Sequence, residues 1–114
     1  MRSRKKFAIP TVNNRLTPHF GRCEQFAIIE TEDNRILKVE YATPPFHEPG
    51  VYPRFLMEND VNVIIVGGIG RKAQNLFAQH DIEVYMGVNS DSPEKLVKDY
   101  LNNRLQISRN PCDH

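Results

Sequence analysis

The segment Thr17–Phe26 (TPHFGRCEQF) contains the residues best suited to bind a metal. His19 and Cys23 lie four positions apart, with Gly21 between them. Imidazole and thiolate groups are good ligands for soft and borderline metals. Arg22 adjoins Cys23, and a nearby cation lowers the pKa of a thiol when the two groups face each other. Two ligands do not complete a zinc site, so the segment is either part of a binding site or a polar turn.

A second loop, PPFHEPG, carries one more imidazole and a carboxylate, His47 and Glu48. Its prolines exclude regular structure. If this loop and the first emerge at the same edge of a sheet, His19, Cys23 and His47 converge into a three-ligand site. Cys112 and His114 add two further donors in a polar tail that we expect to be disordered.

The segment VGGIGRKA places three glycines between an apolar run and a helical pattern. Glycines permit positive φ and close backbone approach, and N–H groups at a helix start favour an anion. Gly68, Gly70 and Ala73 almost fit a dinucleotide fingerprint, but no acidic residue ends the next strand and no P-loop Gly-Lys-Ser/Thr is present. The segment is therefore either a tight turn required for packing or a turn that binds an anion.

The apolar pattern predicts five strands and three helices that position these segments. The expected strands are residues 5–12, 24–30, 35–42, 61–68 and 82–88, and the expected helices are residues 51–60, 70–81 and 91–105. The order β-β-β-α-β-α-β-α indicates an α/β fold with a mixed five-stranded sheet, antiparallel at first and parallel later. Residues 13–23 read as a long polar connection, and residues 35–42 alternate like a half-buried strand.

Two local signals refine this arrangement. Pro10 must lie at the end of its strand, at a bulge or at an edge, because it cannot donate to a ladder. Ser92 is a helix N-cap, and Pro93 suits the first turn that follows. The apolar stripe of that last helix comprises Leu96, Val97, Tyr100, Leu101 and Leu105.

Composition restricts the class of protein. The 114 residues suit a single domain, with a core of residues 5–105 between polar N- and C-terminal tails. The net charge of +1 gives no field suited to nucleic acid, and the basic cluster Arg2–Lys6 reads as a solvated tail. No apolar run reaches membrane-spanning length and no signal peptide is visible. With only two cysteines, we expect a cytoplasmic protein without a disulfide framework.

The sequence contains no convincing catalytic constellation. A Cys/His pair can act as nucleophile and base, but no oriented third group is evident. The carboxylates Asp33, Glu48, Asp60 and Asp81 all fall in turns or at helix ends, where such groups are usually solvated.

Two motifs together resemble the dinitrogenase iron–molybdenum cofactor binding family. AIPTVNNRLTPHFGRCEQFAIIE is similar to the opening of that family, in which a first strand is followed by HFG and a small residue or cysteine. VNVIIVGGIGRKAQNLFAQHDIEVYMGV is similar to its second half, with the double-glycine turn. The resemblance covers residues 5–105. It implies a ribonuclease-H-like three-layer fold without the nuclease carboxylates, and a role in nitrogenase cofactor assembly.

The resemblance also assigns residues. The HFG histidine corresponds to His19, the first ligand candidate, whereas Cys23 stands where the family often has alanine or serine. The double-glycine turn corresponds to Gly67, Gly68 and Gly70, and His47 is what remains of a loop that is His-rich in many members.

A polynuclear anionic cluster needs only one or two protein ligands if backbone N–H groups and basic side chains assist. His19 or Cys23, the turn Gly67–Gly70, and Arg22 or Arg71 would supply these groups for an iron–sulfur or iron–molybdenum type cluster. We therefore expect a metallocluster carrier with a protein partner in cofactor assembly. The main alternative is a non-catalytic module that binds a small anion or a protein without metal. An enzyme using Cys23, or a nuclease suggested by the fold, are the remaining readings.

Overall fold

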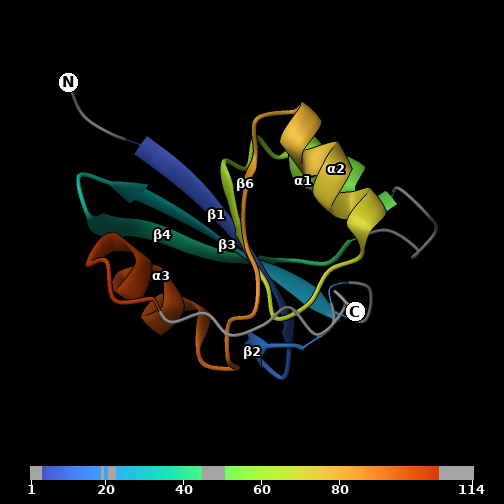
Figure 1. The fold of residues 1–114 in the computed structure, drawn as a ribbon. Coiled ribbons are helices and arrows are strands. Elements are labelled where there is room, and N and C mark those ends of the chain that lie inside the picture. Colours follow the sequence, from blue (N-terminus) through green and yellow to red (C-terminus); the bar gives the residue numbers. More distant parts are fainter. Residues whose placement is uncertain (1–3, 19, 21–22, 45–50, 106–114) are drawn as a thin grey trace.

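The computed structural model describes residues 4–18, 20, 23–44 and 51–105. Their elements follow in the order β1 (Arg4–Val12), β2 (Arg15–Leu16), β3 (Gln25–Glu32), β4 (Arg35–Ala42), α1 (Val51–Glu58), β5 (Val63–Ile65), α2 (Arg71–Gln79), β6 (Glu83–Tyr85) and α3 (Pro93–Leu101). Figure 1 shows one sheet with α1 and α2 on one side and α3 on the other.

The sheet is mixed, as predicted, but within the described residues it has six strands and not the predicted five. Five of them lie in the order β4-β3-β1-β5-β6, and β2 pairs with β1. β3 pairs antiparallel with both β1 and β4, whereas β5 pairs parallel with both β1 and β6. The α/β class and the three helices are confirmed. Because β5 and β6 run parallel, the loops that leave them emerge at one edge of the sheet, next to the end of β1.

The expectation for Pro10 is wrong: it lies at no strand end, bulge or edge but inside the central strand β1, a position that proline normally avoids. On one side it is paired with Phe26 of β3. On its other side, β1 pairs with β5 at Phe7 and Ala8 and with β2 only from Thr11 onward. Pro10 therefore falls in the gap between two partner strands, where its missing N–H breaks no ladder.

Two further expectations about the first half of the chain are wrong. The connection expected over residues 13–23 contains the short strand β2, whose Leu16 is buried. β4 is not half-buried: it forms an edge of the sheet, and Leu37, Val39 and Tyr41 are exposed on it. Edge position depends on which strands pair at long range, so alternation within residues 35–42 did not reveal it.

The sheet separates two apolar clusters. Ala8, Phe26 and Ile64 face α1 and α2, where they join Tyr52, Leu56 and Phe77. The other face joins Phe7, Ile9, Ala27, Ile29, Val63 and Ile65 to Leu96 and Val97 of α3. The alternation of neighbouring residues between the two clusters follows from the period of two in a strand. The expected apolar stripe of the last helix is confirmed by this packing.

Asn and Asp residues form the turns. Asp33 and Asn34 connect β3 to β4 with φ of 50° and 68°, and Asp60 and Asp81 also have positive φ after α1 and α2. Asp and Asn tolerate this conformation better than other non-glycine residues. Asp33, Asp60 and Asp81 thus lie in turns, as predicted.

Candidate functional site

The turn between β5 and α2 is the glycine-rich segment, and Gly67 is its most restricted position. A Cβ on Gly67 would lie 3.0 Å from Pro18 Cα and 3.1 Å from Pro18 O. Such distances require the backbone of the neighbouring segment to shift. By contrast, a Cβ on Gly70 would meet nothing within 4 Å. Gly67 is therefore needed for the close approach of this turn to the backbone of Pro18. None of the three glycines of the turn has a positive φ, because among the described residues Gly87 is the only glycine with one.

The segment after β2 is held directly against this turn. The Phe20 N–H donates to the Gly68 carbonyl at 3.1 Å. The Phe20 ring is buried and lies 5.7–5.9 Å from the rings of Phe26, Tyr52 and Phe77. Pro18 and Phe20, the sequence neighbours of His19, therefore both contact the glycine turn.

The N-terminus of α2 carries no side-chain cap. Gly70 occupies the N-cap position with extended backbone, φ −70° and ψ 156°. The first turn contains Arg71 and Lys72 and no acidic residue. The partial positive charge of a helix N-terminus is usually matched by acidic side chains, so two basic residues there favour an external anion. Lys72 was not among the predicted site residues, although it follows Arg71 directly in the sequence.

Cys23 does not have the activated thiol that its neighbour Arg22 suggested. Its side chain is 8% exposed and belongs to the apolar cluster under α1 and α2. Burial raises the pKa of the Cys23 thiol to about 11, although its hydrogen bond with Tyr52 acts in the opposite direction. A thiol is a metal ligand only as the thiolate. In this conformation Cys23 is thus a protonated core residue, and the contact with Tyr52 joins the end of the first loop to the start of α1.

Four of the predicted binding residues fall outside the described part of the chain: His19, Gly21, Arg22 and His47. Within the part that is described, no group of three or more His, Cys, Asp and Glu side chains is placed to hold a metal ion. The convergence of His19, Cys23 and His47 therefore stays a prediction.

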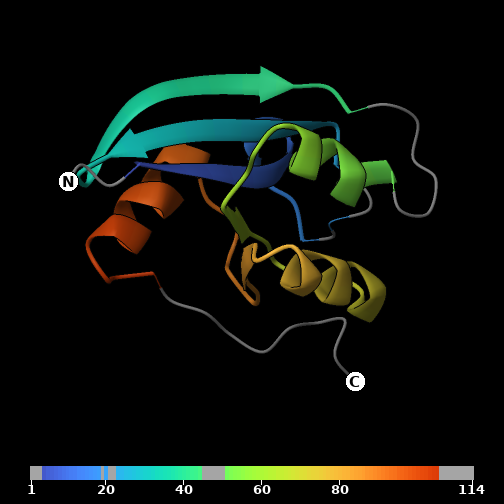
Figure 2. The same ribbon diagram turned by 90° about the horizontal axis from the view of Figure 1, so that it is seen from above.

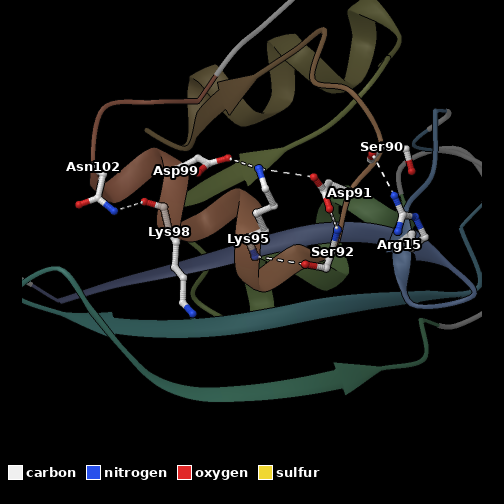
Figure 3. Close-up of polar contacts among 8 residues, drawn as sticks. All are labelled: Arg15, Ser90, Asp91, Ser92, Lys95, Lys98, Asp99 and Asn102. Atoms are coloured by element: carbon white, nitrogen blue, oxygen red, sulfur yellow. Dashed lines mark hydrogen bonds and ion pairs between the residues drawn. The ribbon is translucent and has the colours of Figure 1, made fainter.

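The neighbouring turn, between β6 and α3, is built differently. It lies beside the glycine turn, because the Gly87 N–H donates to the Gly67 carbonyl at 2.8 Å. Figure 3 shows its polar groups bonded to one another: Ser92 Oγ accepts from the Lys95 N–H, and Asp91 Oδ1 accepts from the Ser92 N–H at 2.8 Å. The predicted Ser92 cap is confirmed. This turn also holds β2, since Ser90 Oγ donates to the Leu16 carbonyl at 2.8 Å.

Residues 3–103 match the model of the family described as dinitrogenase iron-molybdenum cofactor. The chain belongs to that family. The matched range includes the first loop, the glycine turn and α3, so the two motifs that carry the resemblance belong to one continuous family domain.

Relatives and solved structures extend this likeness. An uncharacterised protein of Methanocaldococcus jannaschii is 42% identical over 106 residues, which cover 89% of each chain. The crystal structure of the protein PH0822 is similar with a TM-score of 0.87 and 27% identity, over 96% of this chain and 99% of that one. The apo form of the orange protein from Desulfovibrio gigas has a TM-score of 0.74 at 19% identity, covering 94% and 95%, and so shares the fold. Among the described residues, no helix is long and apolar enough to cross a membrane.

Proposed function

We propose that this family member is a cytoplasmic carrier of an iron–sulfur or molybdenum-containing cluster, with a ribonuclease-H-like single domain as its scaffold. The observation that carries the proposal is the basic N-terminus of α2 without a side-chain cap, next to a glycine turn that contacts Pro18 and Phe20, the sequence neighbours of His19. The family membership supports a link to cofactor assembly, in which the cluster is cargo that a protein partner delivers or receives.

The residues suit a cargo that is anionic and weakly ligated. Backbone N–H groups at the start of α2, together with Arg71 and Lys72, favour negative charge. His19 would supply the principal ligand, and Arg22 and Gly21 would border the cluster. A site with few protein ligands releases its cargo more readily than a closed four-ligand site, which is what a carrier requires.

Cys23 enters this proposal only as a conditional ligand. Its thiol would have to lose a proton and leave the contact with Tyr52 before it could bind iron or molybdenum. Metal binding and proton release are coupled in this way for thiol ligands generally. We therefore assign the principal ligand role to His19 and a secondary one to Cys23 and His47.

The test is an anaerobic titration with a synthetic four-iron–four-sulfur cluster and with molybdate, followed by visible absorption and by metal analysis after gel filtration. We expect His19→Ala to abolish stable iron binding, and Arg71→Glu with Lys72→Glu to weaken it by roughly tenfold or more, because each charge near a helix end contributes about 0.3–1 kcal/mol. Arg35→Glu is the matched control, since this exposed arginine lies at the start of β4, in the hairpin at the other end of β1.

The alternative is a module that binds a small anion through the same turn without any metal. The uncapped start of α2 would serve that function equally. Protein purified without oxygen that contains stoichiometric iron or molybdenum excludes the alternative. The alternative would be established if the protein binds molybdate through Arg71 and Lys72 but binds no iron cluster, and if His19→Ala leaves molybdate binding unchanged.

A further inference from the structure

The two edges of the sheet differ in length. β6 forms one edge with only three residues, Glu83–Tyr85, and short edge strands resist pairing with other chains. β4 forms the other edge with eight residues, and it contains no proline. Figure 2 shows β4 lying outermost in the sheet, beyond β3. Among the described residues, no strand pairs with the outer side of β4.

Exposed apolar side chains are concentrated on this same strand. Of the described residues, the large hydrophobic side chains that remain exposed are Leu37 at 54%, Val39 at 36% and Tyr41 at 37%. All three belong to β4. An edge strand that exposes apolar residues is a site where another strand can add.

The charges of β4 are complementary to those of an identical strand. Lys38 and Glu40 flank Val39 and form an exposed ion pair with each other at 2.7 Å. If two copies of β4 run antiparallel with Val39 opposite Val39, each Lys38 lies opposite the Glu40 of the other copy. In the same register, Leu37 lies opposite Tyr41. Opposite charges directly across two strands stabilise pairing, and like charges destabilise it.

From these observations we propose that β4 is a homodimerisation strand, which pairs antiparallel with β4 of a second copy about a two-fold axis at Val39. The pairing extends the sheet across both copies, gives the outer backbone groups of β4 hydrogen-bond partners, and covers the exposed apolar side chains. It uses neither the glycine turn nor α2, so it is independent of cluster binding.

Charge reversal tests the register. In sedimentation equilibrium, the protein should approach twice its 13.2 kDa monomer mass as its concentration rises from micromolar toward millimolar. Lys38→Glu and Glu40→Lys should each weaken dimerisation by roughly tenfold or more, because each places like charges across both symmetric pairs. The double variant should restore it. An equimolar mixture of the two single variants should form a heterodimer, since the two carboxylates of one variant then face the two ammonium groups of the other.

The control is Arg15→Glu, the same change of charge on β2, which pairs with β1 on the far side from β4. It should leave dimerisation unchanged. Circular dichroism and thermal unfolding would verify that every variant folds. A protein that stays monomeric over the whole range, or a dimer that is insensitive to the reversals and to their recombination, would overturn the proposal. If the protein stays monomeric, the exposed apolar residues of β4 would be available to bind a different protein and not a second copy.

Discussion

The turns that start α2 and α3 make an informative comparison, because they are built from the same plan. Each follows a three-residue parallel strand, and each has a glycine two residues after that strand, Gly67 in one turn and Gly87 in the other. The two turns are also hydrogen-bonded: Gly87 donates to Gly67, and Val88 donates to Val66 at 3.2 Å. Differences between them therefore arise from side chains and not from their place in the fold.

The start of α3 is satisfied by its own residues. Ser92 caps the helix, Pro93 occupies its first turn, and Glu94 adds a negative charge where the helix dipole favours one. Lys95 bridges Asp91 at 3.5 Å and Asp99 at 3.0 Å, as Figure 3 shows. An anion approaching this turn would meet carboxylates and a cap already in place.

The start of α2 has none of these features. Gly70 has no side chain to cap the helix, and the charges of the first turn are positive. Helix stability alone does not explain the positive charges at the start of α2, because a helix N-terminus favours negative charge. This difference supports the proposal that the N-terminus of α2 binds an anionic ligand.

The largest expected effect distinguishes two glycines of the same turn. Gly67→Ala should destabilise the protein by about 1–3 kcal/mol, because the new methyl group lies against the backbone of Pro18. Gly70→Ala should change the free energy of unfolding by less than about 0.5 kcal/mol. Its methyl group meets no atom, and the poorer N-cap preference of alanine is offset by the lower entropy of the unfolded chain. Urea unfolding measures both. Equal losses for the two variants would show that the turn does not depend on the contact with Pro18.

Sequence patterns indicated that this turn mattered, but not which glycine was constrained. The constraint comes from Pro18, which is distant in the sequence. It depends on tertiary packing, which the spacing of the glycines does not reveal. The Ser92–Pro93 signal was reliable because an N-cap acts within one helical turn. The same distinction applies to the strands: the apolar run that contains β5 was recognisable, whereas β2 exists because Leu16 is bonded to Asp91 and Ser90.

The candidate site divides in the same way. The positions of the glycine turn and of the basic residue Arg71 were predictable, because strand, turn and helix are consecutive there. The state of Cys23 was not. Its neighbour Arg22 suggested a lowered thiol pKa, but the burial that raises it depends on the fold around the residue, including Tyr52 of α1.

The next prediction removes the cap that α3 has and α2 lacks. Ser92→Ala should destabilise the protein by about 0.5–1 kcal/mol, the lower part of the usual range, because the hydrogen bond to the Lys95 N–H is long at 3.4 Å. Ser92→Gly should cost less, since glycine is tolerated at an N-cap. Thermal unfolding of the three proteins measures this order. Cluster or molybdate binding should not change, and a change would contradict the separation of the two turns.

The converse substitution gives α2 the cap that α3 has. Gly70→Ser should stabilise the protein by a few tenths of a kcal/mol, because serine is only slightly better than glycine at an N-cap. The same hydroxyl would occupy a backbone N–H that an anion needs, so binding of molybdate or of the iron cluster should weaken. Isothermal titration measures binding to Gly70→Ser and to Gly70→Ala, and the comparison separates the effect of the hydroxyl from the effect of the added side-chain volume. A gain in stability with unchanged binding would remove the start of α2 from the proposed site.

The smallest expected effect is the pH dependence of the capped turn. The Ser92 N–H, followed by the charge of Lys95, holds the pKa of Asp91 below its usual value. A carboxyl group with a lowered pKa in the folded state stabilises the protein above its unfolded pKa of about 3.9, and this stabilisation is lost as the pH falls through the lower folded value. Asp91→Asn should therefore be slightly less stable than the parent protein at pH 7, where the carboxylate is charged, and should flatten the fall in thermal stability between about pH 5 and pH 2. The acid slope of the unmodified protein should be steeper in low salt, because added salt screens the contribution of the Lys95 charge. An unchanged acid slope in Asp91→Asn would mean that the Asp91 carboxylate does not stabilise the start of α3.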